Sequence, residues 1–183
     1  MKPLFASIAL TAALAAAPAQ AALAVGDNAP DFSAKASLGG KEFDFSLADA
    51  LKKGPVVLYF YPAAFTKGCT IEAHDFAEAT DKFAALGATV IGVSHDDIAK
   101  LDKFSVSECR SKFAVAADPE GKVIGEYDAQ LKGNPALADR ISYVITPDRK
   151  IAFAYTDMNP DQHVALTMAE VKKWKDGQKT ASP

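Results

Sequence analysis

The sequence has two cysteines, and the first lies where a thiolate could react. Cys69 follows the apolar run 55–61 and a short loop, and we expect a helix to begin at this cysteine. The N-terminus of a helix offers free backbone N–H groups and a partial positive charge, which stabilise an anion. The thiolate is the nucleophilic form of cysteine, whereas a free thiol with a pKa near 8.5 is mostly protonated at neutral pH. The position therefore indicates nucleophilic or redox chemistry.

A reactive thiolate needs more stabilisation than a helix end gives. Lowering a thiol pKa by about 2 units requires roughly 2.7 kcal/mol of preference for the charged form. A helix N-terminus supplies up to ~2 kcal/mol of that preference. A cation close to the sulfur must supply the rest, so the chemistry predicts a Lys or Arg from another part of the chain.

The loop before the cysteine contains residue types that suit such a site. The Thr66 hydroxyl can accept one hydrogen bond and donate another, and Gly68 places no side chain beside the sulfur. Pro62 fixes the backbone at the end of the apolar run and has no N–H. By residue type alone, the loop is equally consistent with Thr66 as a helix cap and Cys69 as a small buried apolar residue.

Strands and helices alternate around this loop. We expect strands at 31–35, 42–45, 55–61, 88–93, 114–117, 141–145 and 151–155. We expect helices at 46–54 and 69–86, and two more helices that begin near Asp97 and at Asn159. The continuous apolar strands suit a sheet that is covered on both faces, and Ile98, Leu101 and Val106 should face the core. This order predicts one three-layer α/β domain with a mixed sheet. Ligands of such sheets bind outside the carboxyl ends of the strands, which is where 62–69 should lie.

The loop resembles a known signature. Pro62, Thr66 and Cys69 match the Pro-x-x-x-Thr-x-x-Cys pattern of peroxiredoxins, and the string 59–72 is similar to the Q-type branch, also called bacterioferritin comigratory proteins. The resemblance extends over nearly all of 22–183. It implies a thioredoxin-like fold with a central mixed β-sheet flanked by helices and the peroxiredoxin N-terminal extension. It also implies reduction of hydrogen peroxide and organic hydroperoxides by cysteine, without a cofactor.

The resemblance assigns roles to the loop residues. Cys69 would be the peroxidatic residue, whose thiolate attacks one peroxide oxygen and becomes a sulfenic acid while water or an alcohol leaves. Thr66 would hydrogen-bond the peroxide, Pro62 would shield the pocket from bulk water, and Gly68 would support the site by its small size. Lys67 departs from the pattern, because proline is common there in the family.

The resemblance also supplies the cation. Arg140, just ahead of the expected strand 141–145, matches the family arginine that would stabilise the thiolate and the charge developing on the peroxide. Glu72 matches the position that holds this arginine in place. The alternatives are a surface charge at a strand end for Arg140 and, for Glu72, a carboxylate favoured in the first turn of a helix.

Cys109 is the only other cysteine, and many Q-type proteins instead carry a second one where this sequence has His74. The resemblance implies that Cys109 resolves the sulfenic acid by an intramolecular disulfide, which makes the protein an atypical two-cysteine enzyme. Because the two Cα atoms of a disulfide lie roughly 4.4–6.8 Å apart, we expect local unfolding during turnover. A permanent structural disulfide, a buried Cys109 on a stripe with Val106 and Phe113, and resolution by an external thiol stay open.

The first residues predict export. Met1-Lys2, the apolar stretch 4–17 and the small-x-small pattern Ala19-Gln20-Ala21 are typical of a secretory signal peptide cleaved after Ala21, the alternative being a buried N-terminal helix. The mature chain, 22–183, would be a single periplasmic or otherwise exported domain with a flexible tail after about 175. The formal net charge of the whole chain is −3. No basic stripe indicates binding to nucleic acid or an anionic membrane.

The remaining patterns favour no other chemistry. The three histidines, His74, His95 and His163, have no ligand spacing with the cysteines, so we expect no metal site. No nucleotide-binding motif is present. We therefore expect a monomeric peroxidase whose reductant is a thioredoxin-like or glutaredoxin-like thiol protein. The rival from another class is a non-catalytic exported binding domain with structural cysteines.

Overall fold

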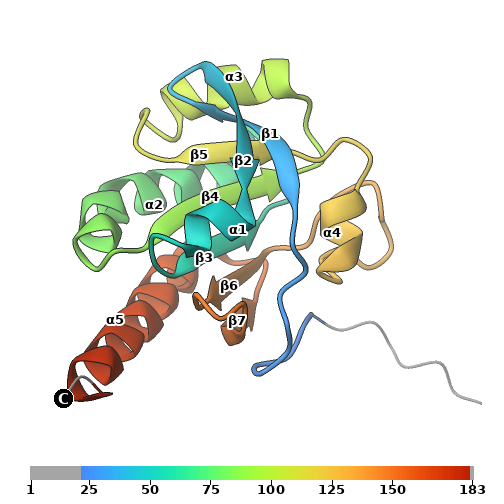
Figure 1. Cartoon of the computed structure of the whole chain (residues 1–183). Helices are drawn as coiled ribbons and strands as arrows, with labels where there is room; N and C mark the ends of the chain where they lie inside the picture. Colours follow the sequence, from blue (N-terminus) through green and yellow to red (C-terminus); the bar gives the residue numbers. More distant parts are fainter. Residues whose placement is uncertain (1–21, 182–183) are drawn as a thin grey trace, which may run out of the picture.

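One mixed sheet organises the part of the chain that the computed structural model describes, residues 22–181, with side chains described to residue 179 (Figure 1). Its strands are β1 (Ser33–Leu38), β2 (Lys41–Ser46), β3 (Val56–Phe60), β4 (Thr89–Ser94), β5 (Ala114–Ala117), β6 (Ile141–Ile145) and β7 (Ile151–Thr156). The order across the sheet is β2-β1-β5-β4-β3-β6-β7. The predicted signal peptide, residues 1–21, lies outside the described residues, so export stays a prediction.

The pairing of the strands determines where helices must lie. The pairs β3–β4 and β4–β5 are parallel, and the other pairs are antiparallel. Parallel neighbours need crossover connections, and the helices α2 (Lys67–Ala85) and α3 (Ile98–Ser107) provide them. The other helices are α1 (Leu47–Leu51), α4 (Lys122–Glu126), the 3₁₀ turn η1 (Pro160–Gln162) and α5 (His163–Ala181). This arrangement confirms the predicted thioredoxin-like α/β fold.

The central strand β3 divides the core into two clusters. All five of its residues are buried, and successive side chains of a strand point to opposite faces. Leu58 and Phe60 pack on one face with residues of α1 and α4. Val57 and Tyr59 pack on the other face with residues of α2, α3 and α5, and both cysteines belong to this second cluster. Figure 1 shows α2 and α5 next to each other on their side of the sheet.

The helix that carries Cys69 begins two residues earlier than predicted, at Lys67. Phe76, Ala79 and Phe83, which are spaced at the helical period, are buried on one face of the helix. Gly87, which has a positive φ of 81°, follows the end of the helix, where a left-handed residue commonly stops one. Among residues 22–181, no helix combines the length and apolar character that a membrane span requires.

Three local predictions differ from the structure. Val106 is 50% exposed, so the prediction that it faces the core is wrong. Helix α3 ends at Ser107 and Arg110 has a positive φ of 52°, so Cys109 lies in the turn after the helix and not on a continuous helical stripe. Helix α4 was not predicted, because a helix of only five residues directly after the turn 119–121 is too short to show a helical period.

Candidate active site

The loop between β3 and α2 is held by hydrogen bonds on both sides. Asp96, after β4, accepts a 2.7 Å hydrogen bond from the backbone N–H of Ala64. The Thr66 hydroxyl donates to the carbonyl of Ala63 at 2.9 Å, and Thr66 occupies the cap position of α2 without a capping bond from its side chain. The exposed ring of Phe65 packs edge-on against a ring of α3. The loop is therefore a defined support for the start of α2.

Cys69 lies in the first turn of α2 and is only 1% exposed. Both cysteines are free thiols in this structure. The Nη2 atom of Arg140 donates to the Cys69 sulfur at 3.4 Å. Arg140 stands directly before β6 and is itself buried, with 2% exposed. The cation that the thiolate argument required is thus supplied from a strand that neighbours β3 in the sheet.

Each nitrogen of the Arg140 guanidinium has a different partner. Its Nη1 donates a short hydrogen bond to Oε2 of Glu72, and its Nε donates to the carbonyl oxygen of Met158 at 3.0 Å. The third nitrogen is the one at the Cys69 sulfur. Three contacts from one planar group fix its orientation, which an ammonium group of lysine could not reproduce.

Glu72 is fully buried behind the arginine. Burial raises the pKa of this carboxyl to about 8, although the attraction of Arg140 lowers it. Its second oxygen, Oε1, has no hydrogen-bond partner among the described residues, and the ring nitrogen Nδ1 of His163 lies 3.7 Å away. The Glu72 carboxyl therefore keeps its proton to a higher pH than an exposed glutamate does.

Gly68 allows the close approach of the arginine. A Cβ atom at this position would lie 3.0 Å from Nη2 of Arg140. Pro62 is partly buried at the end of β3, whereas Thr66 and Lys67 are exposed beside the first turn of α2. The structure therefore brings the Arg140 guanidinium against both Gly68 and the Cys69 sulfur.

Cys109 is completely buried in the turn that follows α3. Burial raises the pKa of its thiol, and the charge of Glu108 raises it further. Burial raises the pKa of the Tyr59 hydroxyl, and a negative charge on either cysteine would raise it further. That hydroxyl has no hydrogen-bond partner among the described residues. The two thiols thus share one aromatic cluster and do not form a bond in the folded state.

Ion pairs attach the segment around Cys109 to α2. His74 Nε2 lies 2.9 Å from Oε2 of Glu108, so the residue at the family's usual second-cysteine position contacts the neighbour of Cys109. Farther along α2, Arg110 pairs with Glu78 at 3.0 Å and Lys112 pairs with Asp81 at 3.2 Å.

Sequence reasoning missed the polar residues behind the arginine. Ser142 and His163 are buried and hydrogen-bonded to each other at 2.8 Å. The alternation of a strand gives one signal, because Ser142 stands two residues after Arg140 and so shares its face. Nothing in the local pattern indicated that His163, the first residue of α5, is completely buried.

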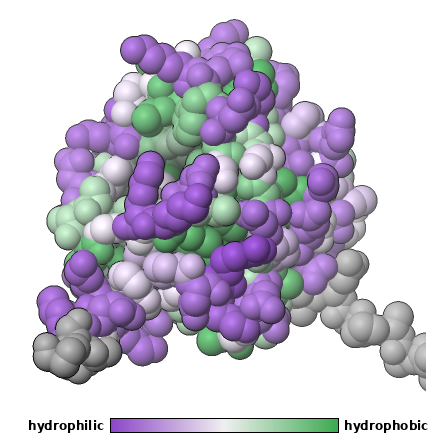
Figure 2. Space-filling model, viewed as in Figure 1, coloured by the Kyte–Doolittle hydropathy of each residue, from purple (hydrophilic) through white to green (hydrophobic). Residues whose placement is uncertain are grey.

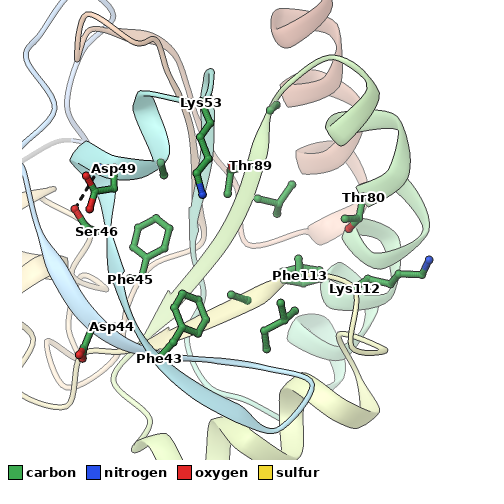
Figure 3. A pocket seen from close by; sticks show the side chains of 15 residues that line it. Phe43, Asp44, Phe45, Ser46, Asp49, Lys53, Thr80, Thr89, Lys112 and Phe113 are labelled. Carbon is green, nitrogen blue, oxygen red and sulfur yellow. Dashed lines mark hydrogen bonds between the residues drawn. The ribbon is translucent and has the colours of Figure 1, made fainter.

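A groove elsewhere on the surface does not include the site. Its volume is about 470 Å³, and it lies between β2, α1 and α2, with Phe43, Phe45, Lys53 and Phe113 in its lining (Figure 3). The face of the molecule in Figure 2 is mostly hydrophilic, with apolar side chains exposed between polar ones. Within residues 22–181, no cluster of three His, Cys, Asp or Glu side chains could hold a metal ion.

The fold and the site together define a class of protein. A buried cysteine in the first turn of a helix, with a guanidinium against its sulfur, on a thioredoxin-like sheet, is the arrangement of a thiol-dependent oxidoreductase.

Comparison with known proteins identifies the family. The AhpC/TSA family model matches residues 25–154. Peroxiredoxin Q from wheat chloroplasts is 32% identical over 166 residues, covering 85% of this chain and 74% of the relative, and the rice protein of that name is 33% identical over 144 residues, covering 73% and 66%. The crystal structure of peroxidoxin BcpB from Mycobacterium tuberculosis superimposes with a TM-score of 0.73 at 31% identity, covering 81% of this chain and 96% of that one. The chain belongs to the AhpC/TSA family and is a Q-type peroxiredoxin, a thiol peroxidase.

Proposed function

We propose that this protein reduces hydrogen peroxide and organic hydroperoxides through Cys69 and that Cys109 resolves the product by an intramolecular disulfide. The observation that carries the proposal is the 3.4 Å contact between Arg140 and the Cys69 sulfur. The same guanidinium is held by Glu72 and by the carbonyl of Met158, so its charge stays at the sulfur. A fixed cation at this point stabilises both the thiolate and the negative charge that develops on the peroxide.

The first step is a nucleophilic displacement. The Cys69 thiolate attacks one oxygen of the peroxide, the O–O bond breaks, and an S–O bond forms. The leaving oxygen takes a proton from solvent and departs as water or an alcohol, and the sulfur remains as a sulfenic acid. The Thr66 hydroxyl would hydrogen-bond the peroxide, and Pro62 would limit access of bulk water.

The second step joins the two sulfurs. The Cys109 thiolate attacks the Cys69 sulfur, an S–S bond forms, the S–O bond breaks, and the sulfenic oxygen takes a proton from solvent and leaves as water. A thioredoxin-like or glutaredoxin-like protein would then reduce the disulfide by thiol exchange. Because Cys109 is buried and its pKa is raised, its segment must leave the core before it can react.

The segment after α3 is suited to local unfolding. Arg110 and Ser111 both adopt positive φ angles, of 52° and 55°, and left-handed backbone costs roughly 1–2 kcal/mol per residue that is not glycine. The ion pairs of Arg110 and Lys112 with α2 are exposed, and exposed pairs contribute only about 0–1 kcal/mol each. Release of this segment therefore breaks few strong interactions.

The resolving role has a single-cysteine alternative, in which an external thiol reduces the sulfenic acid. The complete burial of Cys109 favours it. We propose further that the enzyme works as a monomer, since an intramolecular resolving cysteine needs no partner subunit. We also propose, from the predicted signal peptide, that it works in the periplasm or another exported location.

Mass spectrometry of the reduced protein tests these proposals. After one equivalent of hydrogen peroxide, wild type should lose two hydrogens, Cys109→Ser should gain one oxygen at Cys69, and Cys69→Ser should stay unchanged. An unchanged steady-state rate in Cys109→Ser would establish the single-cysteine route. Thiols that react no faster than a model thiol would place the protein among non-catalytic domains.

Release of the Cys109 segment can be tested separately. The double variant Glu78→Gln/Asp81→Asn removes two of its attachments to α2, so the disulfide should form faster after oxidation of Cys69. Asp49→Asn, which breaks the exposed pair with Lys52 on α1, is the matched control and should have no effect. Equal rates of disulfide formation in all three proteins would show that these ion pairs do not limit resolution.

A further inference from the structure

Behind the active-site arginine lies a buried histidine to which the peroxidase chemistry assigns no role. His163 is completely buried at the start of α5. Its Nε2 lies 2.9 Å from the carbonyl oxygen of Asp157, and its Nδ1 lies 2.8 Å from the Ser142 hydroxyl. The same Nδ1 edge faces the unpartnered Oε1 of Glu72 at 3.7 Å. One ring therefore touches three elements around Arg140.

The partners of the ring determine its protonation. A carbonyl oxygen only accepts hydrogen bonds, so Nε2 carries the proton and donates to Asp157. Burial lowers the pKa of His163, and the charge of Arg140 contributes to that shift. In the neutral ring Nδ1 is then an acceptor, and the Ser142 hydroxyl donates to it. The ring orientation is fixed from both sides.

Two routes connect this ring to the arginine. Along the first, His163 holds the Asp157 carbonyl, and the next residue, Met158, holds Nε of Arg140 with its own carbonyl. Along the second, the Nδ1 edge lies beside Glu72, whose other oxygen binds Nη1 of Arg140. The ring therefore holds one support of the guanidinium by a hydrogen bond and lies against the other, Glu72, without one.

We propose that His163 is a positioning residue for peroxide reduction, which holds the Arg140 guanidinium against the Cys69 sulfur through the Asp157–Met158 carbonyls and limits the movement of Glu72 by packing beside it. The proposal rests on the proposed function, because it gives His163 a role only in the reaction of Cys69. The physical reason is that, among the described residues, the guanidinium donates hydrogen bonds only to Met158, Glu72 and Cys69, so little else would keep its plane aligned if the first two shifted. A small rotation of the guanidinium would lengthen its contact with the sulfur.

Other charged and titratable groups face this cluster and also contribute to its pH dependence. They are Asp75 on α2, Asp139 and Arg140 ahead of β6, and Tyr155 and Asp157 at the end of β7, with the ring of Tyr155 packed edge-on against His163. Since these groups are the same in every variant below, changes between variants report the histidine itself.

Three substitutions separate the two routes. In His163→Gln the side-chain amide can still donate to the Asp157 carbonyl but has no group at the Nδ1 position. In His163→Asn the amide can still meet Ser142 beside Glu72 but cannot reach Asp157. His163→Leu removes both polar contacts. The measurements are the rate constant for oxidation of Cys69 by hydrogen peroxide in a Cys109→Ser background, the pH midpoint of thiolate formation, and the thermal midpoint of unfolding.

The expected result is a graded loss. The peroxide rate constant should fall about 3- to 30-fold in His163→Gln and His163→Asn, the range typical of coupled neighbouring residues. It should fall further in His163→Leu, and the thiolate midpoint should move to higher pH in all three. In an Arg140→Lys background the same substitutions should have little further effect, because they act through the arginine.

Two results would overturn the inference. One is a lowered unfolding temperature with an unchanged peroxide rate and an unchanged thiolate midpoint, which would make His163 purely structural. The other is a full additional loss in the Arg140→Lys background, which would mean that His163 does not act through the arginine. In both cases wild type would still reduce peroxide, whereas failure of the proposed function would remove peroxide reduction from wild type as well.

Discussion

Removal of the Arg140 guanidinium tests the central physical argument about the active site. In Arg140→Ala the sulfur of Cys69 loses its only charged hydrogen-bond donor among the described residues. We expect the thiolate to form at higher pH and the peroxide reaction to slow. Glu72 should not add a new charge, because burial already raises its pKa to about 8 with the arginine present, and loss of the arginine raises it further.

The magnitude follows from the 3.4 Å distance between Nη2 and the sulfur. A unit charge pair at that separation contributes about 1 kcal/mol at the permittivity of water and about 5 kcal/mol at an effective value of about 20. Because 1.36 kcal/mol corresponds to one pH unit, the thiolate midpoint should rise by about 1 to 4 units.

The assay is the ultraviolet absorbance of the thiolate against pH, with Cys69→Ser as the blank, together with stopped-flow oxidation by hydrogen peroxide. Arg149→Ala is the matched control, since it deletes an exposed arginine in the β6–β7 turn. Arg140→Lys keeps the charge but not the three-way contact, and it should fall between wild type and Arg140→Ala. A midpoint that stays the same in folded Arg140→Ala would refute the claim that the guanidinium stabilises the thiolate.

Three further predictions follow from other contacts. Gly68→Ala would place a Cβ 3.0 Å from Nη2 of Arg140, so the rate of peroxide reduction should fall about 10-fold. The far-ultraviolet circular dichroism should stay native, and a wild-type rate would contradict the prediction. Folded Glu72 binds a proton up to about pH 8, whereas the unfolded carboxyl loses it near 4.5, so the free energy of unfolding should fall as pH rises through this window. Urea unfolding of Glu72→Gln should show a smaller fall, and the same pH dependence in both proteins would exclude this carboxyl as the cause. Gly92→Ala would bring a Cβ within 2.6 Å of the Tyr59 ring, so it should unfold at lower temperature by several degrees, and an unchanged midpoint would mean that the ring moves freely.

Local pattern was sufficient for most of the secondary structure. The apolar run that became β3 and the spacing of Phe76 and Phe83 on α2 reflect side chains that must be buried at the periods of a strand and a helix. The errors occurred where local signals are weak. Val106 has the apolar character of a core residue, yet it is half exposed near the end of α3.

The sequence alone determined which atoms could react. Two cysteines, a Thr-x-x-Cys loop at the end of a buried strand, and an arginine before a later strand fix the nucleophile and its possible cation, because residue type and position along a helix or strand are local properties. Tertiary structure alone decided which groups meet. Arg140 reaches Cys69 only because β6 pairs with β3, and His163 reaches Glu72 only because α5 packs on α2. Such contacts join residues 71 and 91 positions apart, and no local pattern encodes distances of that kind.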